Sequence, residues 1–435
     1  MNSKNTALYL IVILGLSLIV SSCRKEKLFT DSSAKVEFSK DTIVFDTVFV
    51  TIGSTYERFT VFNPYNNTIV LSQISLEKGT ASSFRINVDG VAGAVIQDIE
   101  IEPKDSVYVF VEVTVDPTSG TKPFVIEDKI NFTVNGNRQQ VHLAAWGQDA
   151  YFHYNELVCD ETWANDKPHV LYGVVAVGFP DLASNCTLTI PAGTEIYAHA
   201  DAVLYVYESK LIVNGTKTDK VVFQGDRREA SFAAEPGQWF GIRFAVARNS
   251  VIRHAVIYNA TAGIYADTAY ASDSISLYNV RSYNHSFASL FAQGARIHAE
   301  NCEFGRAGVN SVALRIGGSY YFNHCTIRNN WTRSTRTSPA LVLNDYYQSG
   351  SSIIPRPIQR CNFYNSIIYG SLDNELVRDT VPLNISNYYF DHCLIKTDST
   401  ADALEFNQKI FDQCANCLFN IPHSTRCITR WLFRR

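Results

Sequence analysis

Phe322-Asn323-His324-Cys325-Thr326-Ile327 is a six-residue phrase that recurs through the second half of this chain. It reads apolar, polar, Asn or His, small, variable, apolar. Six other stretches repeat it: 252–257, 277–282, 299–304, 363–368, 390–395 and 414–419. Successive copies begin 25, 22, 23, 41, 27 and 24 residues apart. A repeat in the twenties with short apolar strands and no helical pattern predicts a stacked β-solenoid.

Aligning the phrases gives columns that would form ladders along the solenoid. The first apolar column is Ile252, Leu277, Ala299, Phe322, Phe363, Phe390 and Cys414. The Asn/His column is His254, Asn279, Asn301, His324, Asn365, His392 and Asn416, and the small column that follows includes Cys302, Cys325, Cys393 and Cys417. Parallel strands on neighbouring coils lie about 4.8 Å apart, so equivalent residues meet. We expect the small and apolar columns inside and the Asn/His column at a bend.

Length and composition limit the classes of protein to which this chain can belong. A chain of 435 residues exceeds one ordinary core, so several domains or a repeat array are expected. The 23 Tyr and 26 Phe, beside a single Met, favour an all-β protein. A net charge of −4 gives no basic patch of the kind that binds nucleic acid, so we expect no such partner. A monomer is expected.

Residues 34–150 alternate apolar and polar in short runs separated by turn signals. Asn135-Gly136, between two such runs, is a strong hairpin signal. Seven or eight strands in about a hundred residues predict an immunoglobulin-like β-sandwich without the inter-sheet disulfide. Such a domain is either a spacer or a binding module.

The first 22 residues read as a signal peptide, with Lys4 before a short apolar run. The run ends in Val20-Ser21-Ser22-Cys23, which resembles the lipobox of bacterial lipoproteins. This resemblance implies a lipid on Cys23, a tether over 23–33 and a partner membrane. An ordinary secretory peptide or signal anchor is the alternative. Arg24-Lys25-Glu26-Lys27 partly resembles the export tag of surface lipoproteins in Bacteroidetes-type bacteria, so we expect an outer-membrane location, surface-exposed or periplasmic.

Residues 151–186 read as a junction and cap. Leu188-Thr189-Ile190-Pro191-Ala192-Gly193 is then echoed by 211–216. These motifs resemble the opening coils of right-handed parallel β-helix proteins, the pectate-lyase-like (pectin lyase-like) superfamily. The whole chain resembles Bacteroidetes lipoproteins that join a sandwich to such a helix. The fold class expected is therefore all-β, with an N-terminal β-sandwich followed by a right-handed parallel β-helix over 187–422. Residues 423–435 form an atypical tail with four unbalanced arginines.

Metal and cofactor sites are not expected. His254 and His324 are three coils apart, or about 14 Å, whereas zinc ligands lie within about 2.3 Å of one ion. Cys302 and Cys325 fit a column of small core residues, although adjacent coils would also permit a bridge. Cys414-x-x-Cys417 is weak evidence for a redox or zinc site, because Cys414 already belongs to the apolar column.

Cys159 and Cys186 flank the first predicted coil and belong to no column. An oxidising cell envelope permits bridges, so we predict a disulfide that pins the junction to the helix.

For function, the sequence favours a non-catalytic, lipid-anchored protein whose β-helix binds a glycan or another envelope or host molecule. The candidate ligand surface comprises Asp267, Arg315, Tyr320, Asp345, Tyr346 and Tyr347, where the tyrosines are either sugar platforms or wall residues. The alternative is a polysaccharide lyase or glycoside hydrolase, with Asp267, Arg315 and Asp345 at its site. The acidic residues lie at different positions within the predicted coils. This favours the non-catalytic binding protein, because hydrolysis needs two carboxylates within about 5–9.5 Å of each other. We therefore expect that the chain is not an enzyme, and we assign no catalytic residue.

Overall fold

The structure is a computed structural model that describes residues 27–49, 56–114, 124–228, 232–270, 272–381, 387–397, 414–415 and 418–420. The chain divides into two compact units, Met1–Asp149 and Ala150–Arg435. Both are built from strands, and the 3₁₀ turn Gly79–Ala81 is the one helical element in the described residues. The predicted signal peptide, Cys23 and the atypical tail lie outside those residues, as do Asn416 and Cys417.

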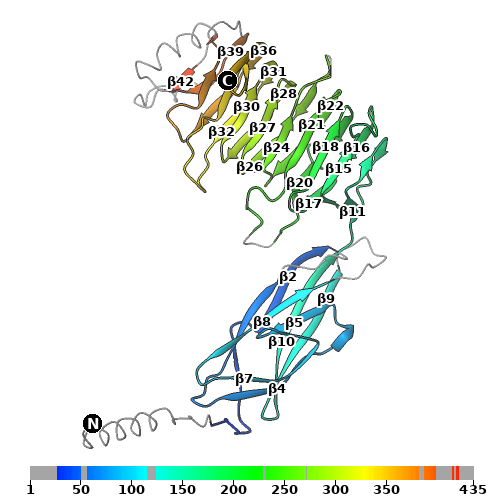
Figure 1. The fold of residues 1–435 in the computed structure, drawn as a ribbon, viewed down its shortest axis with the longest axis vertical. Coiled ribbons are helices and arrows are strands. Elements are labelled where there is room, and N and C mark those ends of the chain that lie inside the picture. Colours follow the sequence, from blue (N-terminus) through cyan, green and yellow to red (C-terminus); the bar gives the residue numbers. More distant parts are fainter. Residues whose placement is uncertain are drawn as a thin grey trace, which may run out of the picture. The chain divides into compact units, whose positions relative to one another are not determined.

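The N-terminal unit is a sandwich of two five-stranded sheets, and its pairing is mainly antiparallel (Figure 1). One sheet runs β1 (Glu37–Phe38), β3 (Glu57–Phe62), β8 (Ser106–Val113), β5 (Phe84–Val88), β6 (Val91–Ala92). The other runs β2 (Thr42–Phe49), β10 (Asn137–Gln148), β9 (Phe124–Val134), β4 (Ile69–Leu76), β7 (Val95–Ile101).

Sequence alternation explains this sandwich. In β8, Val107, Val109, Val111 and Val113 are buried while the residues between them face outward. Asn135 and Gly136 join β9 to β10 with φ angles of 46° and 85°, which is the left-handed geometry of a tight hairpin turn. The predicted hairpin is confirmed. The domain starts earlier than residue 34, because Phe29 stacks on Tyr65 at 4.0 Å.

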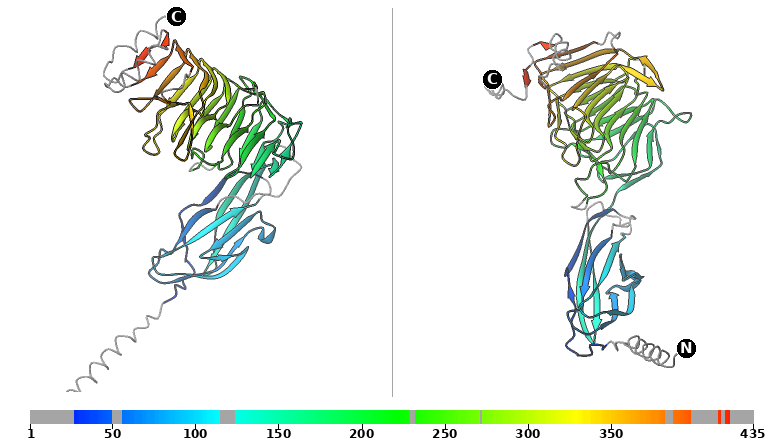
Figure 2. Two further views of the ribbon diagram at one scale, coloured as in Figure 1. Left: turned by 45° about the horizontal axis from the view of Figure 1, so that its top comes forward. Right: turned by 60° about the vertical axis from the view of Figure 1, so that its left-hand side comes forward.

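The second unit is a parallel β-helix, whose coils stack along one axis (Figures 1 and 2). Each regular coil contributes one strand to each of three parallel sheets. Sheet 1 contains β11 (Tyr151–Tyr154), β14 (His169–Tyr172), β17 (Glu195–Ala198), β20 (Val221–Gly225), β23 (Ala255–Tyr258), β26 (Arg281–His285), β29 (Glu303–Ala307), β32 (Thr326–Asn329), β37 (Ile367–Gly370), β40 (Leu394–Lys396) and β42 (Leu418–Asn420).

Sheets 2 and 3 complete the coils. Sheet 2 contains β12 (Leu157–Val158), β15 (Val174–Val177), β18 (Val203–Tyr207), β21 (Gly241–Ala245), β24 (Ala262–Ala266), β27 (Ala288–Gln293), β30 (Asn310–Arg315), β33 (Leu341–Asn344) and β38 (Leu376–Asp379). Sheet 3 contains β13 (Glu161–Thr162), β16 (Thr187–Pro191), β19 (Lys210–Asn214), β22 (Ser250–Arg253), β25 (Ile275–Tyr278), β28 (Arg296–Glu300), β31 (Gly318–Asn323), β36 (Ile358–Tyr364), β39 (Tyr388–Asp391) and β41 (Cys414–Ala415).

The repeated phrase spans the turn from sheet 3 to sheet 1, and its copies stack in the predicted register. The entire first apolar column pairs strand by strand, from Ile252 with Leu277 to Phe390 with Cys414. Inside the helix, Phe363 stacks on Phe322 at 4.8 Å and on Phe390 at 5.0 Å. The ladder prediction is confirmed.

The Asn/His column forms the expected bend. Its six described members have φ angles between 47° and 57°, a left-handed conformation in which Asn is favoured over most residues: His254, Asn279, Asn301, His324, Asn365 and His392. Amides also connect neighbouring coils, since Asn301 Nδ2 donates to Asn279 Oδ1 at 2.5 Å and Asn365 Nδ2 to Asn323 Oδ1 at 3.1 Å.

The β-helix begins earlier than expected. We expect a junction and cap over residues 151–186, but Tyr151 already opens sheet 1 by pairing with His169. Strands β12 and β13 pair with β15 and β16 in the same way. The sequence does not predict this coil, because β12 and β13 are only two residues long and are too short to show a periodic pattern.

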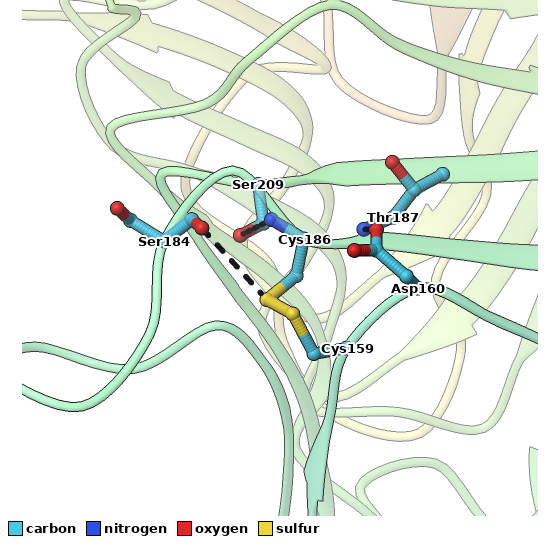
Figure 3. Close-up of a disulfide and its surroundings, with 6 residues drawn as sticks. All are labelled: Cys159, Asp160, Ser184, Cys186, Thr187 and Ser209. Carbon is cyan, nitrogen blue, oxygen red and sulfur yellow. Dashed lines mark hydrogen bonds between the residues drawn. A yellow bond between two sulfur atoms is a disulfide. The ribbon is translucent and has the colours of Figure 1, made fainter.

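Cys159 and Cys186 form a disulfide between the first two coils, at the turn from sheet 2 to sheet 3 (Figure 3). Their Cα atoms are 4.6 Å apart. Asp160, next to the bridge, accepts a hydrogen bond from the Thr187 backbone at 3.0 Å. Cys302, Cys325, Cys361 and Cys393 are buried free thiols, as the small-column interpretation requires for Cys302, Cys325 and Cys393.

Candidate functional site

The predicted ligand residues Asp267, Arg315 and Asp345 lie at the end of sheet 2 where the chain turns toward sheet 3. Ala266 and Leu314, which directly precede Asp267 and Arg315, share one ladder with Leu343, which lies two residues before Asp345. Asp267 follows β24 and Asp345 follows β33, which are three strands apart, or about 14 Å. The structure therefore does not bring these two carboxylates together.

Two residues of the predicted ligand surface are buried. Asp345 is fully buried, and its Oδ1 accepts a hydrogen bond from the Val381 backbone at 2.9 Å. Tyr320 is 1% exposed because it occupies an inward position of β31, where its hydroxyl donates to the Gly317 carbonyl at 2.7 Å. Burial raises the pKa of Tyr320 above its ordinary value. Neither side chain can contact a ligand, so both assignments are corrected.

The excursion predicted over 345–357 is a β-hairpin of β34 (Tyr346–Ser349) and β35 (Ser352–Pro355). Tyr346 is half-buried, and its hydroxyl donates to both oxygens of Asp379, at 3.0 and 3.1 Å. This hydrogen bond raises the pKa of Tyr346. Tyr347 is 46% exposed and Arg315 is also exposed, so these two remain on the surface.

A groove of about 600 Å³ lies beside Asp267 and includes the chain that leaves this hairpin. We call it the Asp267 groove. Its charged and amide side chains come from three coils: Asp267, Gln293, Arg296, Arg356 and Gln359. Arg296 donates to the Gln359 amide oxygen at 3.1 Å, which ties two walls together. A carboxylate, two guanidinium groups and two amides form a set that can hold a hydroxylated, anionic ligand.

Arg243 on β21 fixes the Asp267 carboxylate. Its Nη2 donates to Asp267 Oδ2 at 3.0 Å. The same guanidinium lies between two rings of sheet 2, 5.8 Å from Tyr205 and 5.3 Å from Tyr265. Asp267 is thus held as an oriented carboxylate at the edge of the groove.

Sequence reasoning selected Asp267 but missed Arg243, Arg296 and Arg356. Arg243 lies opposite Tyr265 because β21 pairs with β24, and the aligned phrases of the sequence do not include this pair of strands. Arg356 could not be found from periodicity, because it lies in the excursion, outside the repeat.

A row of rings follows the outer face of sheet 3. It consists of Tyr278, His298, Tyr321, Tyr364 and Tyr389, and successive centroids are 4.6 to 5.9 Å apart. His298 and Tyr321 stack within 15° of parallel, so each covers a face of the other. Rings that cover one another form a wall rather than separate sugar platforms.

The described residues contain no group of three or more His, Cys, Asp or Glu that could hold a metal ion. In the same part of the chain, no helix has the length and hydrophobicity to span a bilayer.

Comparison with known proteins gives only distant likenesses. No family model matches the chain, and no curated protein matches it. Among solved structures, the catalytic unit of a thermostable GH87 α-1,3-glucanase from Streptomyces thermodiastaticus covers 79% of each chain at 10% identity and a TM-score of 0.28. A family 123 glycoside hydrolase from Clostridium perfringens covers 30% of each chain at 8% identity and a TM-score of 0.22. A PapD-like domain of human CEP192 is matched over 94% of its length and 30% of this chain, at 14% identity and a TM-score of 0.19.

Two of these three proteins are glycoside hydrolases, which contradicts the expectation that the chain is not an enzyme. That expectation depended on the acidic residues lying at different positions within successive coils. Such positions are not defined for loops outside the repeat, such as the loop that carries Arg356. The low TM-scores carry no reaction, substrate or residue role over to this chain.

Proposed function

We propose that this protein is carbohydrate-active and that an acidic polysaccharide lies in the Asp267 groove. The observation that carries the proposal is the Asp267 carboxylate, oriented by Arg243 in a groove that also holds Arg296 and Arg356. The two guanidinium groups can neutralise a uronate carboxylate, and the amides of Gln293 and Gln359 can bind hydroxyl groups.

Elimination suits this groove better than hydrolysis. Two carboxylates on either side of the bond are the usual requirement for hydrolysis, and Asp267 is the one acid among the described residues that line the groove. Elimination requires a base and neutralisation of the uronate carboxylate. In our proposal Asp267 accepts the proton on the carbon next to that carboxylate, a carbon–carbon double bond forms as the bond from the neighbouring carbon to the glycosidic oxygen breaks, and that oxygen takes a proton from solvent water.

The test is a panel of acidic and neutral polysaccharides incubated with the purified full chain. Absorbance of unsaturated uronate and the number of new reducing ends are measured. Asp267→Asn should abolish product, and Arg296→Gln should raise KM for an acidic substrate. Asp373→Asn changes an exposed acid outside the groove and serves as the matched control. If no polysaccharide yields product, or if Asp267→Asn retains full activity, the proposal is wrong.

For its location, we propose a lipoprotein of a Bacteroidetes-type outer membrane, anchored through Cys23, with an immunoglobulin-like sandwich as a spacer. Val20-Ser21-Ser22-Cys23 supports the anchor. Two or more acyl chains give stable membrane attachment, whereas one chain is marginal. Labelling of cells with a fatty-acid probe should mark the wild-type chain but not Cys23→Ser, and surface proteolysis would distinguish the two faces of the membrane.

A further inference from the structure

Two adjoining cavities lie at the turns by which the chain passes from sheet 3 to sheet 1. The Asp267 groove, in contrast, lies at the turns from sheet 2 to sheet 3. One, of about 580 Å³, runs beside the Asn/His column and is lined by Lys217, Lys220 and the ladder amides. The other, of about 470 Å³, lies on the outer face of sheet 1 and is lined by Tyr283, Arg306 and Arg328. Arg281 and Glu303 line both cavities, so the two form one continuous groove, which we call the ladder groove.

The ladder groove is strongly cationic in a chain whose net charge is −4. Its charged side chains are Lys217, Lys220, Arg281, Arg306 and Arg328, against the single carboxylate of Glu303. That carboxylate is engaged by Arg281 at 2.8 Å. The nearby acid Asp219 is turned toward Thr218, whose hydroxyl donates to it at 2.8 Å. Such a concentration of one charge in a groove attracts an anionic ligand.

Gly305 opens a notch in the outer face of sheet 1. It pairs with Tyr283 on the coil before and Arg328 on the coil after, so a side chain is missing between them. A β-carbon at Gly305 would lie 2.6 Å from the Arg328 carbonyl oxygen, so glycine is required there. The Tyr283 ring stacks on Tyr258 at 5.7 Å, and on the Gly305 side it lines the cavity. An aromatic surface beside guanidinium groups suits the apolar face of a sugar ring that carries an acidic substituent.

One wall of the ladder groove is the Asn/His column, which supplies a polar side chain from each coil. Asn301 Nδ2 donates to Asn279 Oδ1, and Asn279 Nδ2 lies 3.4 Å from His254 Nε2. Along the sheet the groove extends from β23 to β32, three inter-strand steps or about 14 Å. This extent and repetition fit a short stretch of a linear polymer rather than a single small molecule.

We propose that the ladder groove is a second binding site, for an anionic polysaccharide segment bearing carboxylate or sulfate groups. It does not depend on the Asp267 groove or on any catalysis there. The ladder amides bind hydroxyl groups, the notch takes one sugar ring against Tyr283, and Arg306 and Arg328 bind its acidic group.

Binding of the full chain, purified in detergent, to immobilised polygalacturonate and heparin tests this proposal, with dextran as the neutral probe. Polygalacturonate carries carboxylates alone, whereas heparin carries sulfates as well as carboxylates, so binding of heparin alone would identify sulfate as the recognised group. We expect binding to at least one of them and none to dextran. The charge-removing double variant Arg306→Gln/Arg328→Gln should weaken binding at least about tenfold, because two charge-assisted contacts are lost. Tyr283→Ala should weaken it several-fold, and 0.5 M salt should weaken wild-type binding.

The matched control is Lys35→Gln/Lys210→Gln, which removes two exposed charges outside both grooves and should bind like wild type. Thermal melts of each variant show whether the fold is kept. Asp267→Asn should leave this binding unchanged, which separates the ladder groove from the proposed cleavage site. Equal loss in the control variant, no loss in the Arg306→Gln/Arg328→Gln variant, or equally tight binding of single-stranded DNA would overturn the proposal.

Discussion

The first two coils and the later coils of the β-helix are stabilised in different ways. Residues 151–191 carry the Cys159–Cys186 disulfide and a packed group of rings. The Trp163 ring lies 4.4 Å from His169 and 4.5 Å from His153. Later coils have no described disulfide and rely on polar side chains repeated between coils, such as the Asn/His column. A terminal coil has a neighbour on one side only, so cross-coil ladders can stabilise it from that side alone.

Hydrogen bonds connect the two buried histidines of the early coils. His169 Nε2 lies 2.8 Å from the Ala164 carbonyl, so it carries the proton and donates. His169 Nδ1 must then accept from His153 Nε2, 2.8 Å away, and His153 Nδ1 faces Glu156 at 2.5 Å. His169 is therefore a neutral imidazole, and both of its ring nitrogens are engaged. Burial lowers the pKa of His169 to about 4.

The later coils contain a fully buried ion pair that the early coils lack. Arg336 Nη2 and Glu375 Oε1 are 2.5 Å apart, and both side chains are at most 2% exposed. Glu375 also accepts from the backbones of Leu372 and Ala340, at 2.7 and 2.8 Å. The pair thus closes the loop over 330–339 onto the coil that carries β38.

The largest expected effect comes from breaking that pair. Glu375→Gln leaves the Arg336 charge buried without its partner, so the free energy of unfolding should fall by about 3–5 kcal/mol. Thermal or urea unfolding measures it. Glu235→Gln, which breaks an exposed pair with Arg333, is the control and should cost at most about 1 kcal/mol. Similar losses in both variants would mean that burial does not distinguish this pair.

Removing the disulfide tests the early coils. Cys159→Ser/Cys186→Ser reopens a loop with a sequence separation of 27, and the expected loss is about 3 kcal/mol. Hydrogen exchange should show the loss of protection concentrated in β11 to β16. Reduction by dithiothreitol should reproduce the effect in wild type and leave the double variant unchanged. Uniform loss over all coils would contradict the proposed difference between the two regions.

Acid should also weaken the early coils. His169 has a folded pKa of about 4 and an ordinary value of 6.5, so the unfolded chain takes up the proton first as the pH falls. Its contribution is present above pH 6.5 and is lost between 6.5 and about 4, with a magnitude on the order of 3 kcal/mol. His285 of the later coils, with a pKa lowered by burial to about 3, adds a loss of the same sign. His169→Gln should make the dependence shallower, whereas the exposed His142→Gln should not.

The smallest expected effect concerns the ladder of the later coils. Asn301→Ala places alanine at a φ of 54° and removes an amide hydrogen bond, so it should cost about 1–2 kcal/mol. Asn301→Gly tolerates that φ and isolates the hydrogen bond, so its loss should be smaller. The melting temperatures of the two variants measure this difference in stability. A larger loss for glycine would show that the left-handed conformation is not what selects asparagine.

The repeats made most of the later coils predictable. Phe322, Phe363 and Phe390 could be aligned from the sequence because parallel coils place like residues in one ladder. The same argument failed for the first coil, whose strands β12 and β13 are too short to show a period. Tyr320 was assigned to the ligand surface although alternation from the inward Phe322, two residues later, already places it inside β31.

The candidate site was only partly predictable. Asp267 was selected from its offset after a strand, but Asp345, at a similar offset, is buried by the chain around Val381. Arg296 and Gln359 meet across 63 residues, one from a regular coil and the other after the excursion. Arg296 shares a ladder with Ser319 and Arg360, but Gln359 is the extra residue at a register shift, so the repeat does not place it.

The sequence by itself determined the parallel β-helix, its register and the bend at each Asn or His. Those properties depend on residue type repeated at a nearly fixed interval, which is a local and periodic signal. Only the tertiary structure decided which acids reach solvent, which arginines orient them, and that Gly305 leaves a notch between Tyr283 and Arg328. These depend on distances between side chains of different coils and loops, and such distances are fixed only when the coils have packed.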